Sequence, residues 1–523
     1  MDDQQDCSRS GIGPGNVVLT QIDVELLGRQ RPEIFNSRWS EVGFCASLLG
    51  LMFLGEYLVS GFHIILPSLS IELEIPKEAQ TWPSSVFSLV GGACLLPFGR
   101  LSEKFGGYLV FNTGLAWFSV WTLVSGFSRN YVMLIACRAM KGLGMSAVLP
   151  AGVMLLGKIY RPGPRKNLIF ALYGSFAPIG FFCGIFIGGL SSQYLSWRWY
   201  FWIASIIMAI LMVISLFSIP SDYNNNREIH MDWWGTATIV PGLSLVTYAL
   251  TDSAQAPNGW KSPQILVTFL LGLLCLAAGY YVENQVASSP LLPADLFAPR
   301  YMKRLVLALW LTYGAFGLYL FYSSFYIELV LQKSPIVTAI WYIPMIVGGL
   351  LIGIVGGFTL HLLPGRALLV ISGCGNLLCV LLFAVLPEKP NYWAYIFPAV
   401  VCATIGIDIS FTVSNVYITT ALPEHYQGLA GALINSLLFL GISFWLGVSD
   451  IVVHQTTDLG LKRSYQMAFW LAVGAAGLAL LLYCTIKIGS AKSDFTVQEK
   501  RQMDEANAEG LQQRTDSDQS KIV

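Results

Sequence analysis

Charge is scarce in this sequence, and its scarcity excludes several classes of function. Only 12% of the 523 residues are charged, and 31 acidic residues balance 31 basic ones. A balanced chain has no positive field to hold nucleic acid, so we expect no nucleic-acid partner. None of the five His residues pairs with another at metal-ligand spacing, and no nucleophile–base constellation is visible. We therefore expect no enzyme activity, no metal and no cofactor.

Two further absences concern the compartment. Of the ten Cys residues, all but Cys7 lie inside apolar runs, which is not the pattern of an extracellular disulfide framework. About forty polar residues precede the first apolar run, whereas a cleavable signal peptide has its apolar core close to the N-terminus. We expect the first hydrophobic helix to target the chain instead.

Long hydrophobic runs are what the sequence has in abundance. Hydrophobic residues make up 54% of the chain, and its mean hydropathy is +0.60, which excludes an ordinary soluble domain. Apolar segments of about 20 residues, each able to cross a bilayer as a helix, recur between short polar loops. They lie near residues 42–68, 82–98, 108–126, 131–155, 167–190, 199–219, 233–251, 263–284, 304–328, 336–357, 366–386, 392–418, 427–453 and 465–488. The pattern predicts an all-α polytopic membrane protein with about fourteen transmembrane helices.

The positions of Lys and Arg predict the orientation. With the N-terminus inside, most of them fall on the cytoplasmic side, as the positive-inside rule requires. We therefore expect both termini to be cytoplasmic, in the plasma membrane rather than the vacuolar membrane. Residues 1–40 and 489–523 are polar and predict a disordered leader and a cytoplasmic tail.

Two motifs carry a family resemblance. Residues 99–107, GRLSEKFGG, resemble the G-x-L-a-D-r-x-G-r signature between helices 2 and 3 of the major facilitator superfamily, with Glu103 in place of the usual Asp. Residues 138–144, RAMKGLG, resemble the R-x-x-Q-G-x-G motif of helix 4 in drug:proton antiporters, with Lys141 in place of Gln. In that family the Arg is held to take part in proton coupling, a role that the resemblance carries to Arg138.

Further matches narrow the resemblance. Residues 197–202, WRWYFW, are similar to the entrance to helix 6 in the fourteen-helix branch of these antiporters. Within that branch the sequence resembles the fungal aminotriazole-resistance and low-affinity ammonium transporter subgroup. The fifth span resembles the glycine-rich antiporter motif, through which we expect the two halves to rock against each other. Its glycines are Gly180, Gly184, Gly188 and Gly189.

The resemblance implies a major facilitator fold that works as a monomer by alternating access, in which a midplane cavity opens to each side in turn. It divides the membrane region into an N-terminal six-helix bundle (41–220), two inserted helices with their loops (221–302) and a C-terminal six-helix bundle (303–488). It also implies a gate in the loop after the second span. The gate residues are Gly99, Arg100, Glu103, Lys104 and Gly106.

Ionisable residues inside the predicted spans are the candidate functional groups, because each costs free energy in hydrocarbon. Glu56 and Lys141 lie at similar depth near the midplane, with Arg138 one turn farther out. We expect the three to form a salt-bridged cluster for proton coupling; the alternative is a purely structural pair. Asp408 either lines the substrate cavity or hydrogen-bonds a neighbouring helix. His63 either reaches that cavity or packs as a hydrogen-bonded side chain.

Four other acidic residues fall near the ends of predicted spans, where water is within reach. We expect them to be interfacial. They are Asp252, Glu283, Glu328 and Asp450.

These patterns together predict a membrane transporter. The resemblance implies proton-coupled efflux of a small, largely apolar organic molecule, such as a drug, toxin or secondary metabolite. A facilitator of a small polar solute, such as ammonium or borate, is the alternative, and a non-transporting membrane sensor is a third. The expected partners are the substrate, protons and the lipid bilayer.

Overall fold

The computed structural model describes residues 30–160, 164–220, 231–254, 256, 258–287, 290–359, 363–422 and 427–488. Every regular element in these ranges is helical, which confirms the all-α class. Thirteen of the described helical segments are long and apolar enough to cross a membrane. The 20-residue helix α8 (Trp233–Asp252) is also long enough to span. Most of the predicted leader and all of the predicted tail lie outside the described residues.

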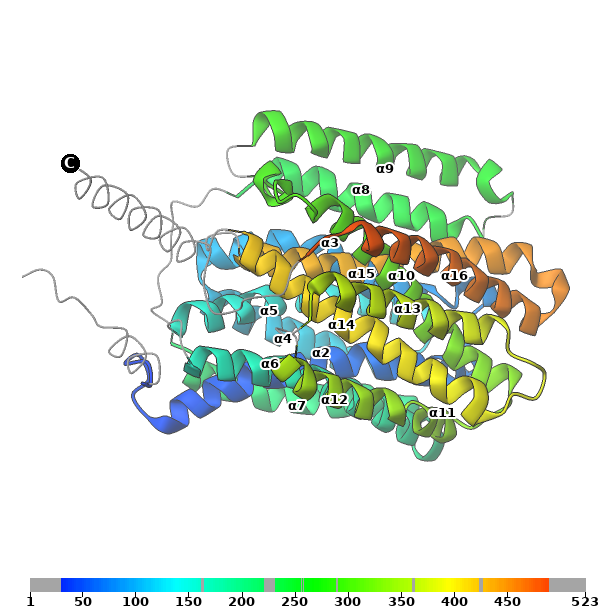
Figure 1. Cartoon of the computed structure of the whole chain (residues 1–523), viewed down its shortest axis with the longest axis horizontal. Helices are drawn as coiled ribbons and strands as arrows, with labels where there is room; N and C mark the ends of the chain where they lie inside the picture. The colour runs from blue at the N-terminus through cyan, green and yellow to red at the C-terminus, as the bar shows by residue number, and fades with distance from the viewer. Residues whose placement is uncertain are drawn as a thin grey trace, which may run out of the picture.

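The spanning helices fall into two groups joined by a helix pair (Figure 1). The first group is α2 (Arg38–Glu72), α3 (Trp82–Phe105), α4 (Gly107–Ser125), α5 (Tyr131–Ile159), α6 (Pro164–Tyr194) and α7 (Trp197–Ser218). The pair is α8 and α9 (Pro263–Tyr281). The second group is α10 (Met302–Phe325), α11 (Pro335–Trp341), α12 (Ile343–Thr359), α13 (Gly365–Ala384), α14 (Phe397–Ala421), α15 (Gln427–Gln455) and α16 (Leu461–Thr485). The predicted span 336–357 is therefore two helices, because α11 ends at Trp341 and α12 begins at Ile343.

Short helical turns extend or connect these helices. They are η1 (Lys77–Ala79), η2 (Gly259–Lys261), η3 (Val282–Val286), η4 (Ala294–Phe297), η5 (Tyr326–Val330), η6 (Tyr392–Ile396) and η8 (Thr457–Leu459). Of these, η3, η5 and η6 are π-helical and adjoin α9, α10 and α14.

Polar side chains and one glycine set several helix ends. The Ser40 amide donates to Ser37 Oγ at 3.1 Å at the start of α2, and the Met133 amide donates to Asn130 Oδ1 at 2.8 Å at the start of α5. Gly106 lies between α3 and α4 with a φ of +91°, which only glycine adopts without strain. This conformation lets α4 begin immediately after α3 ends.

The packing inside each group differs from the packing between them. In the first group α2 packs along α6 and α7, and α5 packs along α3 and α4. In the second group α10 packs along α15 and α16, and α13 packs along α14 and α16. The groups meet where α3 lies along α15 and where α6 lies along α11 and α12. The pair α8 and α9 lies on one side, where α8 contacts α3 and α15 (Figure 1).

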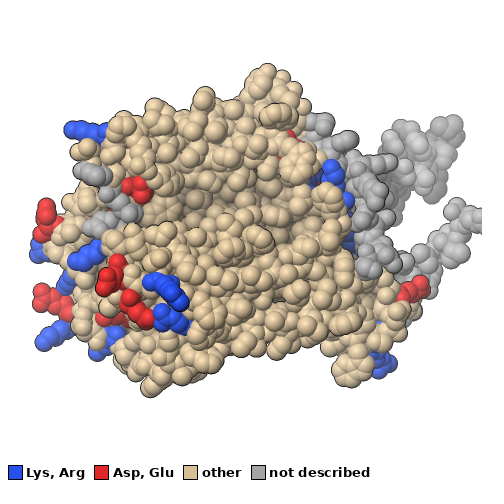
Figure 2. All heavy atoms as spheres, turned by 180° about the vertical axis from the view of Figure 1, so that it is seen from behind, with Lys and Arg blue, Asp and Glu red and all other residues tan. Residues whose placement is uncertain are grey.

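Charged side chains occupy the two ends of the molecule. In the face that Figure 2 shows, Lys, Arg, Asp and Glu gather at the ends, and the wide belt between them carries none. We call the end where α2 begins and α16 ends the terminal end, and the other the opposite end. A belt without charge is the surface that a lipid bilayer requires.

The glycines of α6 pack mostly within the first group. A Cβ on Gly180 would overlap the Phe53 carbonyl, and one on Gly184 would overlap the Tyr57 carbonyl, so α6 lies directly against α2. A Cβ on Gly188 would lie 2.9 Å from the Gly61 carbonyl oxygen. Only the fourth glycine of the motif faces the second group, because a Cβ on Gly189 would lie 2.9 Å from Ala339 Cβ in α11. The expectation that this motif forms the surface between the halves is therefore wrong for its first three glycines.

Adding one methyl group to α6 tests this packing. Gly184→Ala should lower the thermal unfolding temperature in detergent, because the new Cβ must push α2 away at a cost of about 1–3 kcal/mol. The matched control is Gly174→Ala on the same helix, which has no atom within 4 Å of the new Cβ. The control should raise the unfolding temperature slightly, since Ala is favoured over Gly in a helix by up to about 1 kcal/mol. Equal shifts for the two variants would contradict the assignment.

Candidate functional site

The two helix groups touch closely near the opposite end. Thr81, just before α3, donates a hydrogen bond to Asp450 of α15, and Ser85 Oγ lies 2.8 Å from Ser443 Oγ one turn farther in. On the other side of the contact the Ile336 amide donates to Gln193 Oε1 at 3.2 Å. These hydrogen bonds join α3 to α15 and link the end of α6 to the start of α11.

Two predicted interfacial acids are in fact buried. Asp450 is only 6% exposed because it lies inside the contact between α3 and α15. Glu328 is 8% exposed in η5, and its Oε1 is buried without a hydrogen-bond partner among the described residues. A position near the end of a predicted span did not make these two side chains solvent-exposed, because the ends of both helices are packed against other parts of the molecule.

Contacts between the groups are fewer at glycines nearer the terminal end. In the middle of α6, Pro178 approaches α12, since a Cβ on Gly349 would lie 3.6 Å from Pro178 Cβ. One turn closer to the terminal end, Gly174 of α6 and Gly353 of α12 have no atom within 4 Å of a built Cβ. Gly431 of α15 also faces open space, although α15 contacts α3 farther along. The groups are therefore in contact at the opposite end, whereas these three glycines nearer the terminal end have open space beside them.

Two carboxyl groups from different helix groups lie within electrostatic range of each other. Glu56 comes from α2 in the first group and Asp408 from α14 in the second, and they are close enough to interact electrostatically. Both side chains are partly exposed. Tyr173 of α6 lies beside Glu56, and its hydroxyl is buried without a partner in the described part of the chain. A Cβ on Gly349 would lie 3.1 Å from Asp408 Oδ2, so α12 completes this end of the site.

Neither cation of α5 forms the expected salt bridge with Glu56. Arg138 is 2% exposed, its Nε donates to the Pro83 carbonyl at 2.6 Å, and its Cζ lies 3.5 Å from the centre of the Phe62 ring. Lys141 is 0% exposed, and its Nζ lies 4.1 Å from the centre of the Phe201 ring. Aromatic faces attract cations. Aromatic rings therefore lie next to Arg138 and Lys141, where a carboxylate was expected.

Helix rotation explains why this cluster does not form. Gly55 faces α5, because a built Cβ on it would touch Met145, and Phe62 faces α5 seven residues later. Glu56 follows Gly55 and is therefore turned away by about 100°. Depth along the membrane was readable from the sequence, whereas rotational position was not.

His63 lies on the same face of α2 as Glu56, seven residues farther along. It is 7% exposed and meets Phe321 of α10 edge-on, with ring centres 6.3 Å apart. Its Nδ1 is buried without a hydrogen-bond partner among the described residues. His63 thus packs at the contact between the groups, but not as a hydrogen-bonded histidine.

The predicted gate residues lie at the terminal end, but they do not form a loop: residues 99–105 are the last turns of α3, and Gly106 alone connects α3 to α4. Arg100 forms an ion pair with Glu103 within the motif at 3.1 Å, and its Nη2 donates to the Pro290 carbonyl at 3.1 Å. Lys104 lies 5.7 Å from the centre of the Phe105 ring. This end of α3 therefore contacts the segment that follows α9.

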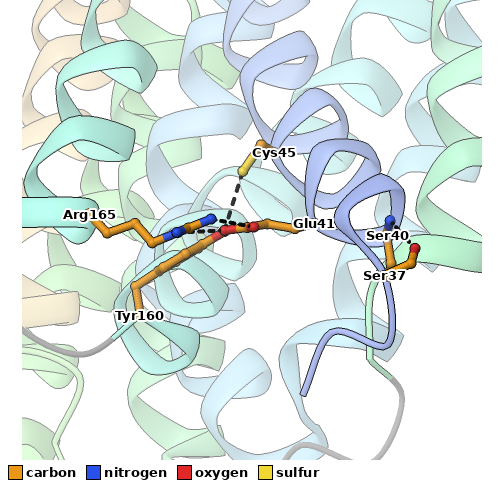
Figure 3. A network of polar contacts seen from close by, with 6 residues as sticks. All are labelled: Ser37, Ser40, Glu41, Cys45, Tyr160 and Arg165. Carbon is orange, nitrogen blue, oxygen red and sulfur yellow. Dashed lines mark hydrogen bonds and ion pairs between the residues drawn. The ribbon is translucent and has the colours of Figure 1, made fainter. Parts of the chain in front are cut away.

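Figure 3 shows a polar network at the start of α2 that the sequence patterns did not predict. Glu41 is 7% exposed and accepts hydrogen bonds from Arg165 Nε at 2.8 Å, Arg165 Nη2 at 2.5 Å and the Tyr160 hydroxyl at 3.0 Å. The Cys45 thiol lies 3.4 Å from the same hydroxyl. The hydrogen bonds that Arg165 donates to Glu41 raise the pKa of Arg165, and burial raises the pKa of Tyr160. The network ties α2 to the adjoining ends of α5 and α6.

Comparison with known proteins agrees with this architecture. Residues 46–446 match the Major Facilitator Superfamily. The chain is 28% identical to the "Low affinity ammonium transporter" of Saccharomyces cerevisiae, over 95% of this chain and 96% of the relative. It is 30% identical to the "Efflux pump terJ" of Aspergillus terreus, over 77% of this chain and 79% of the relative.

A solved structure shows the same fold. The structure of an auto-inhibited peptide transporter of the POT family superposes with a TM-score of 0.62 at 14% identity, over 87% of this chain and 99% of the transporter. This likeness shows a shared fold. The chain belongs to the Major Facilitator Superfamily and is a multi-pass membrane transporter, which confirms the family resemblance of its motifs.

Cysteine cross-linking tests the closed contact at the opposite end. Ser85→Cys with Ser443→Cys should form a disulfide under mild oxidation, because the two hydroxyl oxygens are in contact. Mass spectrometry of digested protein would identify the peptide that joins α3 and α15. The control pair, Ser85→Cys with Gly431→Cys, should form no such peptide, because Gly431 lies near the other end of α15. Equal cross-linking of both pairs would refute the closed contact.

Removing one charge tests the network at the terminal end. Glu41→Gln should destabilise the protein by about 1–3 kcal/mol, because it weakens charge-assisted bonds to Arg165 at a buried position. Thermal unfolding in detergent would measure the loss. Glu72→Gln is the control, since Glu72 pairs with Arg198 at the surface and such pairs contribute about 0–1 kcal/mol. A larger effect at Glu72 would contradict this ranking.

Proposed function

We propose that this transporter exports a small organic molecule in exchange for protons, by alternating access. The carrying observation is that two partly exposed acids inside the membrane region, Glu56 and Asp408, come from different helix groups and lie within electrostatic range of each other. An acid that belongs to the contact between two moving bodies couples its protonation to their separation. The name of the terJ relative as an efflux pump supports the direction.

The proposal assigns the terminal end to the cytoplasm and the chain to the plasma membrane as a monomer. The excess of Lys and Arg in the loops of that end supports the orientation. The two bundles, residues 41–220 and 303–488, would rock about the contacts of α3 with α15 and of α6 with α11. The helix pair α8 and α9, within residues 221–302, would stay packed on one side of the two bundles.

Arg138, Lys141 and His63 have a different role in this proposal. The two cations lie behind aromatic rings rather than at the carboxyl pair, so they would act through the packing of α5 against α2 and α3. His63 would sense the separation of α2 from α10 through its contact with Phe321. The Arg100–Glu103 pair would act as the gate at the terminal end.

A metabolite comparison tests the proposal. Cells with and without the gene are compared for compounds inside and outside, before and after a protonophore collapses the proton gradient. Retention of one organic compound without the gene, reproduced by the protonophore in its presence, is the expected result. Glu56→Gln should reproduce the retention, while Glu72→Gln at the opposite end should export normally. Export that survives the protonophore would overturn proton coupling.

A facilitator of ammonium is the second candidate, and the name of the Saccharomyces cerevisiae relative favours it. Two carboxyl groups in the site are also compatible with a small cation. In the same experiment, a change confined to ammonium that persists with the protonophore would select this function.

A further inference from the structure

We propose that Asp232 and Glu283 bind one proton between them, and that this proton holds the segment after α9 against the start of α8. The two residues lie at the terminal end, where Asp232 precedes α8 and Glu283 belongs to η3, directly after α9. These acids are separate from Glu56 and Asp408, so the proton site is additional to the one in the proposed function.

Gly235, in the first turn of α8, shows how close the two carboxyl groups are. A Cβ built on Gly235 would lie 2.2 Å from Asp232 Oδ2 and 2.8 Å from Glu283 Oε1. The two oxygens are therefore at most 5.0 Å apart, the total of these two distances. Two carboxylates this close repel each other, whereas a single proton between them replaces the repulsion with a strong hydrogen bond.

Asp232 has one oxygen in a hydrogen bond and one without a partner. Its side chain is buried, at 8% exposure, and Oδ1 accepts a hydrogen bond from the Gly235 amide at 2.7 Å, which caps α8. Oδ2 is buried and has no hydrogen-bond partner among the described residues. Buried polar atoms without partners are uncommon in folded proteins. A proton on either carboxyl group would supply the donor that Oδ2 lacks.

Glu283 holds the chain that follows α9. Its Oε1 accepts a hydrogen bond from the Leu291 amide at 3.1 Å, and its Oε2 accepts one from the Leu292 amide at 3.0 Å. From the other side, Arg100 Nη2 donates to the carbonyl of the adjacent Pro290 at 3.1 Å. Residues 290–292 are thus held by Glu283 of the helix pair and by the end of α3.

No base neutralises the pair within the part of the chain that the structure describes. There, Asp232 is the only charged group close enough to interact electrostatically with Glu283. The elements packed around the pair carry charged side chains at the near end of α3 and at the far ends of α8 and α15: Arg100, Glu103, Lys104, Asp252, Asp450 and His454. The nearest base, Arg100, forms its ion pair with Glu103 instead.

The shared proton makes this contact depend on pH. The paired carboxyl groups bind one proton more than two free carboxylates do, so the contact is favoured at low pH and is lost as pH rises past the point at which that proton leaves. The two carboxylates then repel each other, and Glu283 turns away from Asp232 into water. The amides of Leu291 and Leu292 lose their acceptor, and the segment detaches from the helix pair.

Loss of the proton would also reach α3. When residues 290–292 leave the helix pair, the bond from Arg100 to the Pro290 carbonyl loses its fixed acceptor. This link to transport rests on the proposed function, in which the Arg100–Glu103 pair acts as the gate. The proton site itself does not depend on that function.

Hydrogen–deuterium exchange of two backbone amides tests the proposal. Purified full-length protein in detergent is labelled at about pH 6 and about pH 9, a range in which buried carboxyl groups release protons. Mass spectrometry with electron-transfer fragmentation gives a protection factor for single amides, relative to the intrinsic exchange rate at each pH. Leu291 and Leu292 should lose protection by about tenfold or more at the higher pH. The control is the Met133 amide, which should not change, because it bonds to the Asn130 side chain, which does not titrate.

Variants separate the proton from the carboxylate charge. Asp232→Asn places a permanent N–H donor where the proton is proposed, and its oxygen still accepts from the Gly235 amide, so Leu291 and Leu292 should stay protected at both pH values. Glu283→Ala removes the acceptor of both amides and should lower their protection by about tenfold at either pH. Asp252→Asn, at the far end of α8, should keep the pH dependence of the unmodified protein. Size-exclusion profiles show whether each variant is folded.

Several outcomes would overturn the proposal. Equal protection of the two amides at both pH values in the unmodified protein is one, and an equal loss in folded Asp232→Asn is another. Recovery of protection at the higher pH by millimolar Ca²⁺ or Mg²⁺ is a third, because a metal ion and not a proton would then join the carboxyl groups. The measurement uses neither substrate nor proton gradient, so its failure leaves the proposed function standing. Export that survives the protonophore would leave the proton site standing and remove only its link to transport.

Discussion

A charged side chain inside a bilayer needs a partner. The arrangement of the helices in this molecule depends on how each such side chain is paired or covered. Placing such a side chain at the centre of the bilayer costs about 2.5–3.5 kcal/mol on insertion scales. Here Arg138 and Lys141 are covered by the rings of Phe62, Phe87 and Phe201. The acids Glu56 and Asp408 instead keep partial exposure between the helix groups. The two cations and the two acids, which lie near the middle of the membrane region, are therefore kept apart.

Close helix packing is what makes that separation possible. Gly180, Gly184 and Gly188 let α6 lie against the backbone of α2, which holds Glu56 in one rotational position. From the same helix, Pro178 and Gly189 face the second group. Helix α6 therefore belongs rigidly to one group while it presents a contact surface to the other. The acids stand beside that surface, so any movement of the groups changes their surroundings.

The fold was largely readable from the sequence, because hydrophobic length and the charge of the loops depend on local composition. The motif around Arg138 was recognised correctly as part of a transporter of this family. The salt-bridged cluster with Glu56 was wrong, and so was the interfacial placement of Asp450, which accepts a bond from Thr81 across the groups. The network of Glu41 with Arg165 was missed. The sequence signal for this network was an acidic residue, Glu41, at the start of the first predicted span and a basic residue, Arg165, just before the fifth. The predicted orientation places both residues at the same end of the molecule.

By itself the sequence determined the number and depth of the membrane spans, since those follow from how many apolar residues stand between polar loops. It also determined which ionisable groups the bilayer must accommodate. Only the tertiary structure decided which groups come near each other: Glu56 lies within electrostatic range of Asp408 of α14, whereas Lys141 of α5 lies against Phe201. The reason is that a turn of about 100° per residue separates neighbours on a helix. Which side faces which partner depends on contacts, such as Gly184 on Tyr57, between residues far apart in the chain.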